Sequence, residues 1–73
     1  MSLALVGGTQ RVDVMARWLY ARTPRWFTPH IESARLMVGV LDRMDQKQRH
    51  EKLIKMVGVL GAYQYAERFG YIR

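Results

Sequence analysis

The chain has 73 residues, enough for a single domain in which folding buries only about 60% of the surface that the unfolded chain exposes. Hydrophobic residues make up 49% of the chain, which argues against wholesale disorder, and the absence of cysteine excludes disulfides and thiolate metal sites. The formal net charge of +6 suits nucleic acid, an anionic membrane surface or an acidic protein partner, although solubility alone also accounts for a basic bias.

The apolar stretches are short. None approaches the roughly 20 apolar residues of a membrane-spanning helix, and the apolar run in "MSLALVGG" is too brief for a signal peptide. We therefore expect a soluble, cytoplasmic protein with no membrane association.

The first predicted helix begins after two glycines. Gly7 and Gly8 separate a short tail, residues 1–8, from a segment that opens with Thr9. Threonine is a common N-cap because its side-chain oxygen accepts a hydrogen bond from a free N–H of the first turn. The helix is expected to end at Arg22, because the prolines of "TPRWFTP" disfavour helical backbone in the residues before them.

Within residues 9–22, apolar residues recur at the spacing of one helix face. Asp13 and Arg17 lie four positions apart and are expected to form a weakly stabilising ion pair on another face. The predicted core face consists of Val12, Met15, Ala16 and Leu19.

The second predicted helix spans residues 29–44. Thr28 followed by Pro29 is typical of an N-cap and a first helical position, and His30 is interpreted as a solvated or capping residue. At about 100° per residue the apolar residues cover one broad side, while Gly39 points away from it. The expected core residues are Ile31, Ala34, Met37, Val38, Val40, Leu41 and Met44.

The third predicted helix spans residues 46–69. Asp45 and Gln48 resemble a capping box at its start, and Gly70 is placed as the C′ residue, after which the last residues fold back over apolar surface. A break or kink is expected near Gly61. Together the segments predict an all-α fold: a small bundle of three to four helices in one domain.

The pentapeptide "MVGVL" occurs twice, at 37–41 and 56–60. The offset of 19 residues is too short for a two-helix repeat unit. We interpret the copies as two core-facing helical stretches, which places Leu41 and Leu60 in the core and the glycine of each copy on the opposite side. The alternative that the two copies descend from a duplicated segment stays open.

The sequence contains no recognisable catalytic or metal-binding constellation. His30 and His50 each lack a Cys or His at metal-ligand spacing, and the six carboxylates form no acid/base pair. "GGTQR" lacks the Gly-Lys-Ser/Thr ending of a phosphate-binding loop. We expect no enzymatic activity, no cofactor and no small-molecule substrate.

Three segments carry candidate binding residues. In "ARTPRWFTP", arginines flank two aromatics, a combination enriched in interface hot spots, although at least one aromatic is expected to pack on the core. In "RMDQKQRHEKLIK", basic residues outnumber acidic ones, as on a binding surface or a solvated helix face. The third, "YQYAERFGYIR", mixes core and exposed tyrosines. The candidate partner-binding residues are Arg22, Arg25, Trp26, Phe27, Arg43, Lys47, Arg49 and Lys52.

A helix-turn-helix DNA-binding motif is the alternative interpretation. "FTPHIESARL" is typical of its first helix, and a recognition helix could open on Gln46, Lys47, Arg49 and His50. However, "MVGVLDRMD" prolongs the second helix or lengthens the turn beyond the usual three or four residues. A basic amphipathic membrane-surface protein is less favoured, because the apolar faces are sized to bury each other.

In its size, basic charge, all-helical pattern and lack of a catalytic motif, the chain resembles the small phage-encoded transcription regulators that bind host RNA polymerase. The resemblance covers the whole chain and assigns no role to an individual residue. It implies a bacteriophage host-takeover protein that blocks initiation or promotes antitermination. It also implies that the partner is RNA polymerase, bound by protein contact rather than by reading a DNA site, while some nucleic-acid contact stays open.

Overall fold

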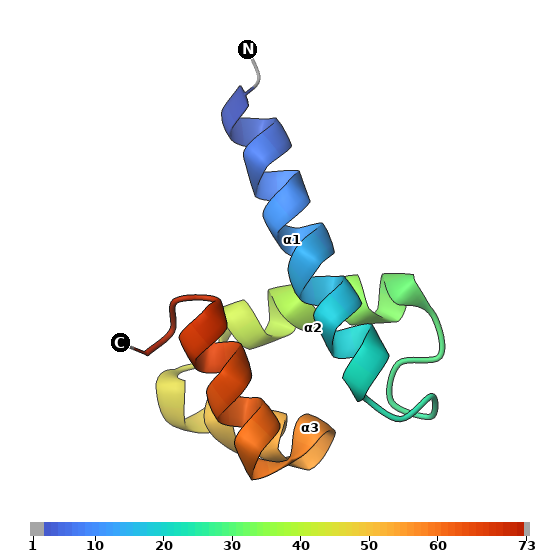
Figure 1. Ribbon diagram of the computed structural model, residues 1–73, viewed down its shortest axis with the longest axis vertical. Coiled ribbons are helices and arrows are strands. Elements are labelled where there is room, and N and C mark those ends of the chain that lie inside the picture. Colours follow the sequence, from blue (N-terminus) through green and yellow to red (C-terminus); the bar gives the residue numbers. More distant parts are fainter. Residues whose placement is uncertain (1–2, 73) are drawn as a thin grey trace.

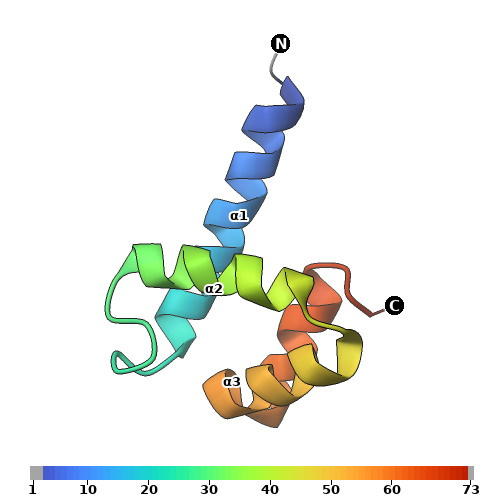
Figure 2. The same cartoon turned by 180° about the vertical axis from the view of Figure 1, so that it is seen from behind.

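Three helices make up the fold: α1 (Leu3–Arg22), α2 (Ile31–Arg43) and α3 (Gln46–Arg68). The computed structural model describes the backbone of residues 3–72 and the side chains of residues 10–72. α2 runs across α1, the N-terminal half of α1 projects beyond the rest of the molecule, and α3 lies at the opposite end (Figures 1 and 2). The prediction of a small all-α bundle is confirmed.

α1 begins earlier than predicted. The helix runs through Gly7 and Gly8, so residues 3–8 form its first turns and not a tail, and Thr9 is an interior residue and not the N-cap. Each interior glycine lowers helix stability by about 1 kcal/mol, which disfavours the helix here but does not end it. The end at Arg22 is as predicted.

The buried face of α1 is rotated from the predicted one. Met15, Ala16 and Leu19 are buried as expected, but Val12 is 38% exposed and Trp18 lies in the core. Burying an indole removes more apolar surface from water than burying a valine, so packing favours the rotation.

Asp13 joins α1 to α2. Its Oδ1 lies 2.9 Å from Nη2 of Arg35, and the predicted pair with Arg17 is not among the ion pairs of the described residues. The carboxylate is turned toward the neighbouring helix, so the ion pair is a tertiary contact and not a local one.

The connector between α1 and α2 is closed by two threonines. Thr23 and Thr28 are buried with their hydroxyls in contact, and the Thr28 N–H donates to the Pro24 carbonyl at 3.0 Å. Thr28 therefore stabilises the loop and is not the N-cap of α2. The N-cap is His30, which is exposed and makes no side-chain cap hydrogen bond, so α2 starts two residues later than predicted.

The buried stripe of α2 is narrower than predicted. Ala34, Val38 and Leu41 are buried, whereas Val40, predicted to be a core residue, is 41% exposed, and Leu36 is 73% exposed. A helix packed mainly on one neighbour buries little more than its central stripe, and Val40 lies at the edge of that stripe.

Two residues separate α2 from α3. The Met44 N–H donates to the Leu41 carbonyl at 3.2 Å and ends α2. Asp45 is the N-cap of α3, and its side chain accepts a hydrogen bond from the Gln48 N–H at 2.8 Å. The predicted N-cap is therefore confirmed.

α3 is bent at Gly58 into two arms, residues 46–57 and 59–68, which we call the first and second arms (Figure 1). Gly58 has φ 83° and ψ 171°, a conformation that residues with a side chain rarely adopt. The break was predicted near Gly61, which is instead helical and buried. A Cβ added there would lie 2.8 Å from Val57 Cβ, so Gly61 permits the close approach of its own arm to the end of the other.

The bend changes which residues of the second "MVGVL" are buried. Met56 is 3% exposed, but Val59 is 58% and Leu60 71% exposed. The prediction that Leu60 is a core residue is wrong. Helical spacing assumes that every residue adds the same rotation, and the conformation of Gly58 resets that rotation.

An aromatic cluster completes the core at the end of the second arm. The Tyr65 ring lies 5.7 Å from the Trp18 ring and 5.0 Å from the Phe69 ring, measured between centroids. Gly70 has φ 86° and is the C′ residue as predicted, after which the Tyr71 N–H donates to the Ala66 carbonyl at 2.7 Å. This 6→1 hydrogen bond is that of a Schellman motif.

The hydroxyl of Tyr65 is buried and has no hydrogen-bond partner among the described residues. An unsatisfied buried hydroxyl costs roughly 1–3 kcal/mol. We expect Tyr65→Phe, which keeps the ring, to raise the free energy of unfolding by about 1 kcal/mol in urea unfolding experiments. A loss of stability would show that the hydroxyl is hydrogen-bonded in solution.

Burial also raises the pKa of the Tyr65 phenol above its ordinary value of 10.0. Above about pH 10 the unfolded chain then holds this proton less than the folded chain does, so the free energy of unfolding falls as the pH rises. The phenylalanine variant lacks this group and should lose less stability between about pH 9 and pH 11. Equal losses in the two proteins would contradict the assignment.

Candidate protein-binding surface

The described residues offer no centre for metal chemistry and no membrane span. No three of their His, Cys, Asp and Glu side chains lie close enough together to hold a metal ion. None of their helices is both long and apolar enough to cross a bilayer. The predicted binding residues lie on surfaces built from basic and aromatic side chains.

The first such surface is the connector surface, which we define as Arg22, Arg25, Trp26, Phe27 and Lys52. Its two aromatic rings lie 5.0 Å apart between centroids but differ in environment. Phe27 is half-buried against the core, and Trp26 is 78% exposed. The expectation that at least one of them packs on the core is confirmed, and the other points into solvent.

Arg22 and Arg25 are each held in place on an aromatic ring of α1. The Arg22 guanidinium lies 4.2 Å from the Trp18 ring centroid. The Arg25 guanidinium lies 3.7 Å from the Tyr20 ring centroid and donates to the carbonyls of Tyr20 and Thr28. Both side chains remain exposed. Cation–π contacts and hydrogen bonds restrict their rotamers, which reduces the entropy lost when a partner binds.

Lys52 connects the two predicted groups of binding residues. Its Nζ lies 5.0 Å from the Phe27 ring centroid, so the first arm of α3 contributes a cation to the connector surface. Arg43 and Lys47 are exposed on the last turn of α2 and the first turn of α3. The structure thus brings only part of the second group to the connector.

Arg49 was predicted to contact a partner, and the structure gives it an internal role. Its Nη1 donates to the Met44 carbonyl at 2.9 Å and lies 3.5 Å from the Leu41 carbonyl. Its guanidinium lies 4.1 Å from the ring centroid of Tyr71, whose hydroxyl donates to Asp42 Oδ1 at 3.0 Å. Arg49 thereby satisfies carbonyls at the C-terminus of α2 and ties that end to the chain's last residues.

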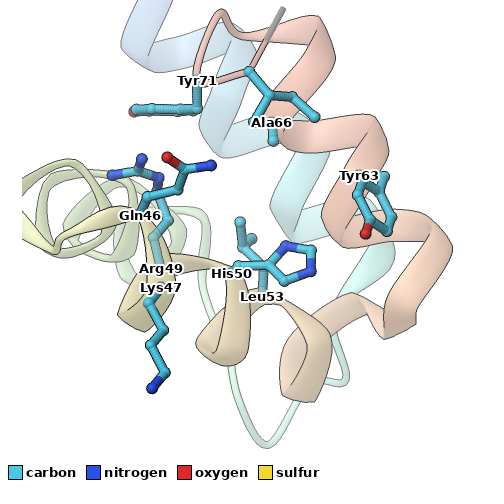
Figure 3. A pocket seen from close by; sticks show the side chains of 9 residues that line it. Gln46, Lys47, Arg49, His50, Leu53, Tyr63, Ala66 and Tyr71 are labelled. Atoms are coloured by element: carbon cyan, nitrogen blue, oxygen red, sulfur yellow. The ribbon is translucent and has the colours of Figure 1, made fainter.

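A groove of about 400 Å³ lies between the two arms of α3 and the residues that follow the helix (Figure 3). We call it the α3 groove. Its polar lining comes from the start of the first arm, and its remaining lining comes mostly from the second arm and beyond. The lining residues are Gln46, Lys47, Arg49 and His50, then the aromatic Tyr63 and Tyr71, and the apolar Leu53, Ala66 and Ile72.

The α3 groove exists because Gly58 folds the arms toward each other. The His50 ring of the first arm lies 4.9 Å from the Tyr63 ring of the second, edge to face (Figure 3). This groove was not predicted, because the break was expected near Gly61 and no contact between His50 and Tyr63 was expected. The available signals were the glycines in a long helix and the tyrosines of "YQYAERFGYIR".

The geometry weakens the helix-turn-helix interpretation. Of the four residues proposed to open a recognition helix, Gln46 and Lys47 are exposed. Arg49 is directed to α2 carbonyls, and His50 packs on Tyr63. Two of the four side chains are therefore committed to contacts within the fold.

Comparison with protein-family models, with curated proteins and with solved structures found no match.

Proposed function

We propose that the chain is a small transcription regulator that binds bacterial RNA polymerase by protein–protein contact and alters initiation or termination. The observation that carries this proposal is Trp26, whose side chain is 78% exposed. Beyond its contact with the Phe27 ring, this mostly exposed indole adds little to the fold, and tryptophan and arginine are both enriched at interface hot spots. Arg22 at the end of α1 and Arg25 in the connector, held on the Trp18 and Tyr20 rings, supply the arginines of that combination.

The charge of the chain supports an acidic protein surface as the target. A net charge of +6 speeds encounter with such a surface, and the fixed cations of the connector surface add specificity. RNA polymerase as the partner follows from the resemblance to small phage-encoded regulators and is part of the proposal.

The competing candidate is a DNA-binding regulator. The two-residue link between α2 and α3 and the exposed Gln46, Lys47 and Gln48 at the start of α3 favour it. The internal contacts of Arg49 and His50 count against it. We therefore place protein binding first.

Trp26→Ala is expected to weaken binding to purified bacterial RNA polymerase by about 30-fold or more, the loss of a hot spot of about 2 kcal/mol. The affinity is measured by biolayer interferometry after nuclease treatment of both proteins. Leu36→Ala is the matched control, since Leu36 is 73% exposed but lies on α2 outside the connector surface. It should change the affinity less than about twofold.

Two results together would overturn the proposal in favour of DNA binding. One is no retention of polymerase after nuclease treatment. The other is a sharp consensus from duplex selection, with a preference of roughly 10³-fold and an affinity that falls steeply with salt. Weak, sequence-blind DNA binding beside retained polymerase supports protein contact.

A further inference from the structure

We propose that the α3 groove binds an acidic peptide segment of a protein partner, in which one bulky apolar side chain is flanked by carboxylates. This inference rests on the proposed function only in taking the partner to be a protein. It adds a second site, formed by the two arms of α3, and it gives the chemistry of the segment that would occupy it.

Arg49 supplies the carboxylate-binding part of the groove. Its Nη1 is used by the carbonyls of Met44 and Leu41, and its guanidinium is packed on Tyr71. A guanidinium has five N–H donors, so these contacts leave donors on Nη2 and Nε. Because the group is already held in place, a carboxylate can bind it with little further loss of side-chain entropy. In Figure 3 the guanidinium lies below the Tyr71 ring and next to Gln46.

The charge of the lining is one-sided. Arg49 and Lys47 are cationic, and none of the residues that line the groove is acidic. Lys47 extends away from the groove in Figure 3 and adds charge at its rim. Asp42, which accepts the Tyr71 hydroxyl hydrogen bond, is a nearby carboxylate but does not line the groove. The lining therefore favours an anionic occupant.

The rest of the groove requires an apolar group beside that anion. Leu53, Ala66 and Ile72 contribute apolar lining, and the rings of His50 and Tyr63 form one side. A bare carboxylate would lose hydration against such a surface without compensation. The volume of about 400 Å³ is at the lower end of small-molecule sites, and it suits one large side chain with its adjacent main chain.

Tyr63 is 52% exposed and keeps a free ring face, but the other aromatic rings of the groove are already in contact with neighbouring side chains. Tyr71 already contacts the Arg49 guanidinium, and its ring is parallel to that of Tyr65 at 5.8 Å between centroids. His50 and Tyr63 pack edge to face on each other. Single-stranded nucleic acid is bound chiefly by stacking on free aromatic faces, so the geometry favours a peptide over an oligonucleotide.

The test uses amide chemical shifts of the full ¹⁵N-labelled chain titrated with three peptides. The first is acetyl-EDFDE-amide, the second replaces its carboxylates by amides (QNFNQ), and the third replaces phenylalanine by alanine (EDADE). We expect the first peptide to shift amides within residues 46–53 and 63–72. We expect both altered peptides to bind at least about tenfold more weakly, because each lacks one of the two required contacts.

Gln46→Glu and Gln48→Glu form a matched pair of variants. They place the same charge in the first turn of α3, where the helix dipole favours it, but only Gln46 lines the groove. Gln46→Glu should weaken binding of the acidic peptide by about threefold to tenfold through repulsion at short range. Gln48→Glu should change it by less than about twofold.

Several outcomes would overturn the proposal. These are shifts outside the groove, equal binding of the neutral peptide, equal effects of the two variants, or a single-stranded oligonucleotide that shifts the same amides at lower concentration. If polymerase binding depends on Trp26 but the peptide causes none of the expected shifts in the groove, the groove proposal is wrong and the proposed function stands. Groove binding of the acidic peptide without polymerase retention would instead contradict the proposed function and leave the groove assignment standing.

Discussion

Leu41→Ala is expected to lower the free energy of unfolding by about 2–5 kcal/mol, whereas Leu60→Ala should lower it by less than about 1 kcal/mol. The two leucines close the two copies of "MVGVL" and differ only in where the fold places them. Leu41 is 0% exposed on the buried stripe of α2, and Leu60 is 71% exposed on the second arm of α3. Truncating the first leaves a cavity, and truncating the second removes atoms that water already contacts.

The loss expected for Leu41→Ala is large relative to the total stability of a small domain. Stabilities of small domains are roughly 5–15 kcal/mol, so a loss of 2–5 kcal/mol would remove a large part of the total. Urea unfolding followed by circular dichroism at 222 nm measures both variants under the same conditions. Similar losses for the two variants would mean that Leu60 is buried in solution and that α3 is not bent as described.

Gly58→Ala is expected to lower the free energy of unfolding by about 1–3 kcal/mol. The cause is the backbone and not a lack of space, since an added Cβ would meet nothing within 4 Å. At φ 83° and ψ 171° a Cβ is strained in a region that is essentially restricted to glycine. Gly39→Ala is the matched control: Gly39 is inside α2 with open space for a Cβ, so alanine should raise stability by about 0.5–1 kcal/mol.

Gly58→Ala also tests the origin of the α3 groove. If alanine straightens α3 into a continuous helix, His50 and Tyr63 separate and their ring contact disappears. Contacts between the two rings in nuclear Overhauser spectra, compared between the parent chain and both glycine variants, report this directly. A Gly58→Ala variant of unchanged stability that keeps the ring contact would show that the bend does not need glycine.

Local rules accounted for the ends of several elements. The C-terminus of α1 at Arg22, the Asp45 cap of α3 and the Gly70 position after α3 were all predicted from adjacent residues. Each depends on hydrogen bonds or backbone preferences that act within about one helical turn, so the neighbouring sequence contains the needed information. The start of α2 was predicted wrongly from Thr28 and Pro29. The Thr28 hydroxyl contacts that of Thr23 within the loop and does not cap the helix.

The candidate site was predictable in composition but not in arrangement. The basic and aromatic connector was predicted from the sequence, and the structure leaves Trp26 exposed there. Arg49 was predicted to be a partner-binding residue, and the fold also directs its Nη1 to the Met44 carbonyl and its guanidinium to the Tyr71 ring, contacts that were not predicted. The difference arises because an arginine next to free helix-end carbonyls satisfies them, and those carbonyls come close only after α2 and α3 are connected by a two-residue link.

By itself, the sequence determined that this chain is helical and basic, that it buries one stripe per helix, and where most helices end. The spacing of apolar residues and the signals at helix ends are local features, so they can be recognised without knowing how the helices pack on one another. Only the tertiary structure decided that Gly58, and not Gly61, turns α3 back on itself. That choice exposes Leu60, brings His50 to Tyr63 and opens the α3 groove. A single residue with positive φ redirects everything after it, and which glycine adopts that conformation is decided by how the two arms pack on the core.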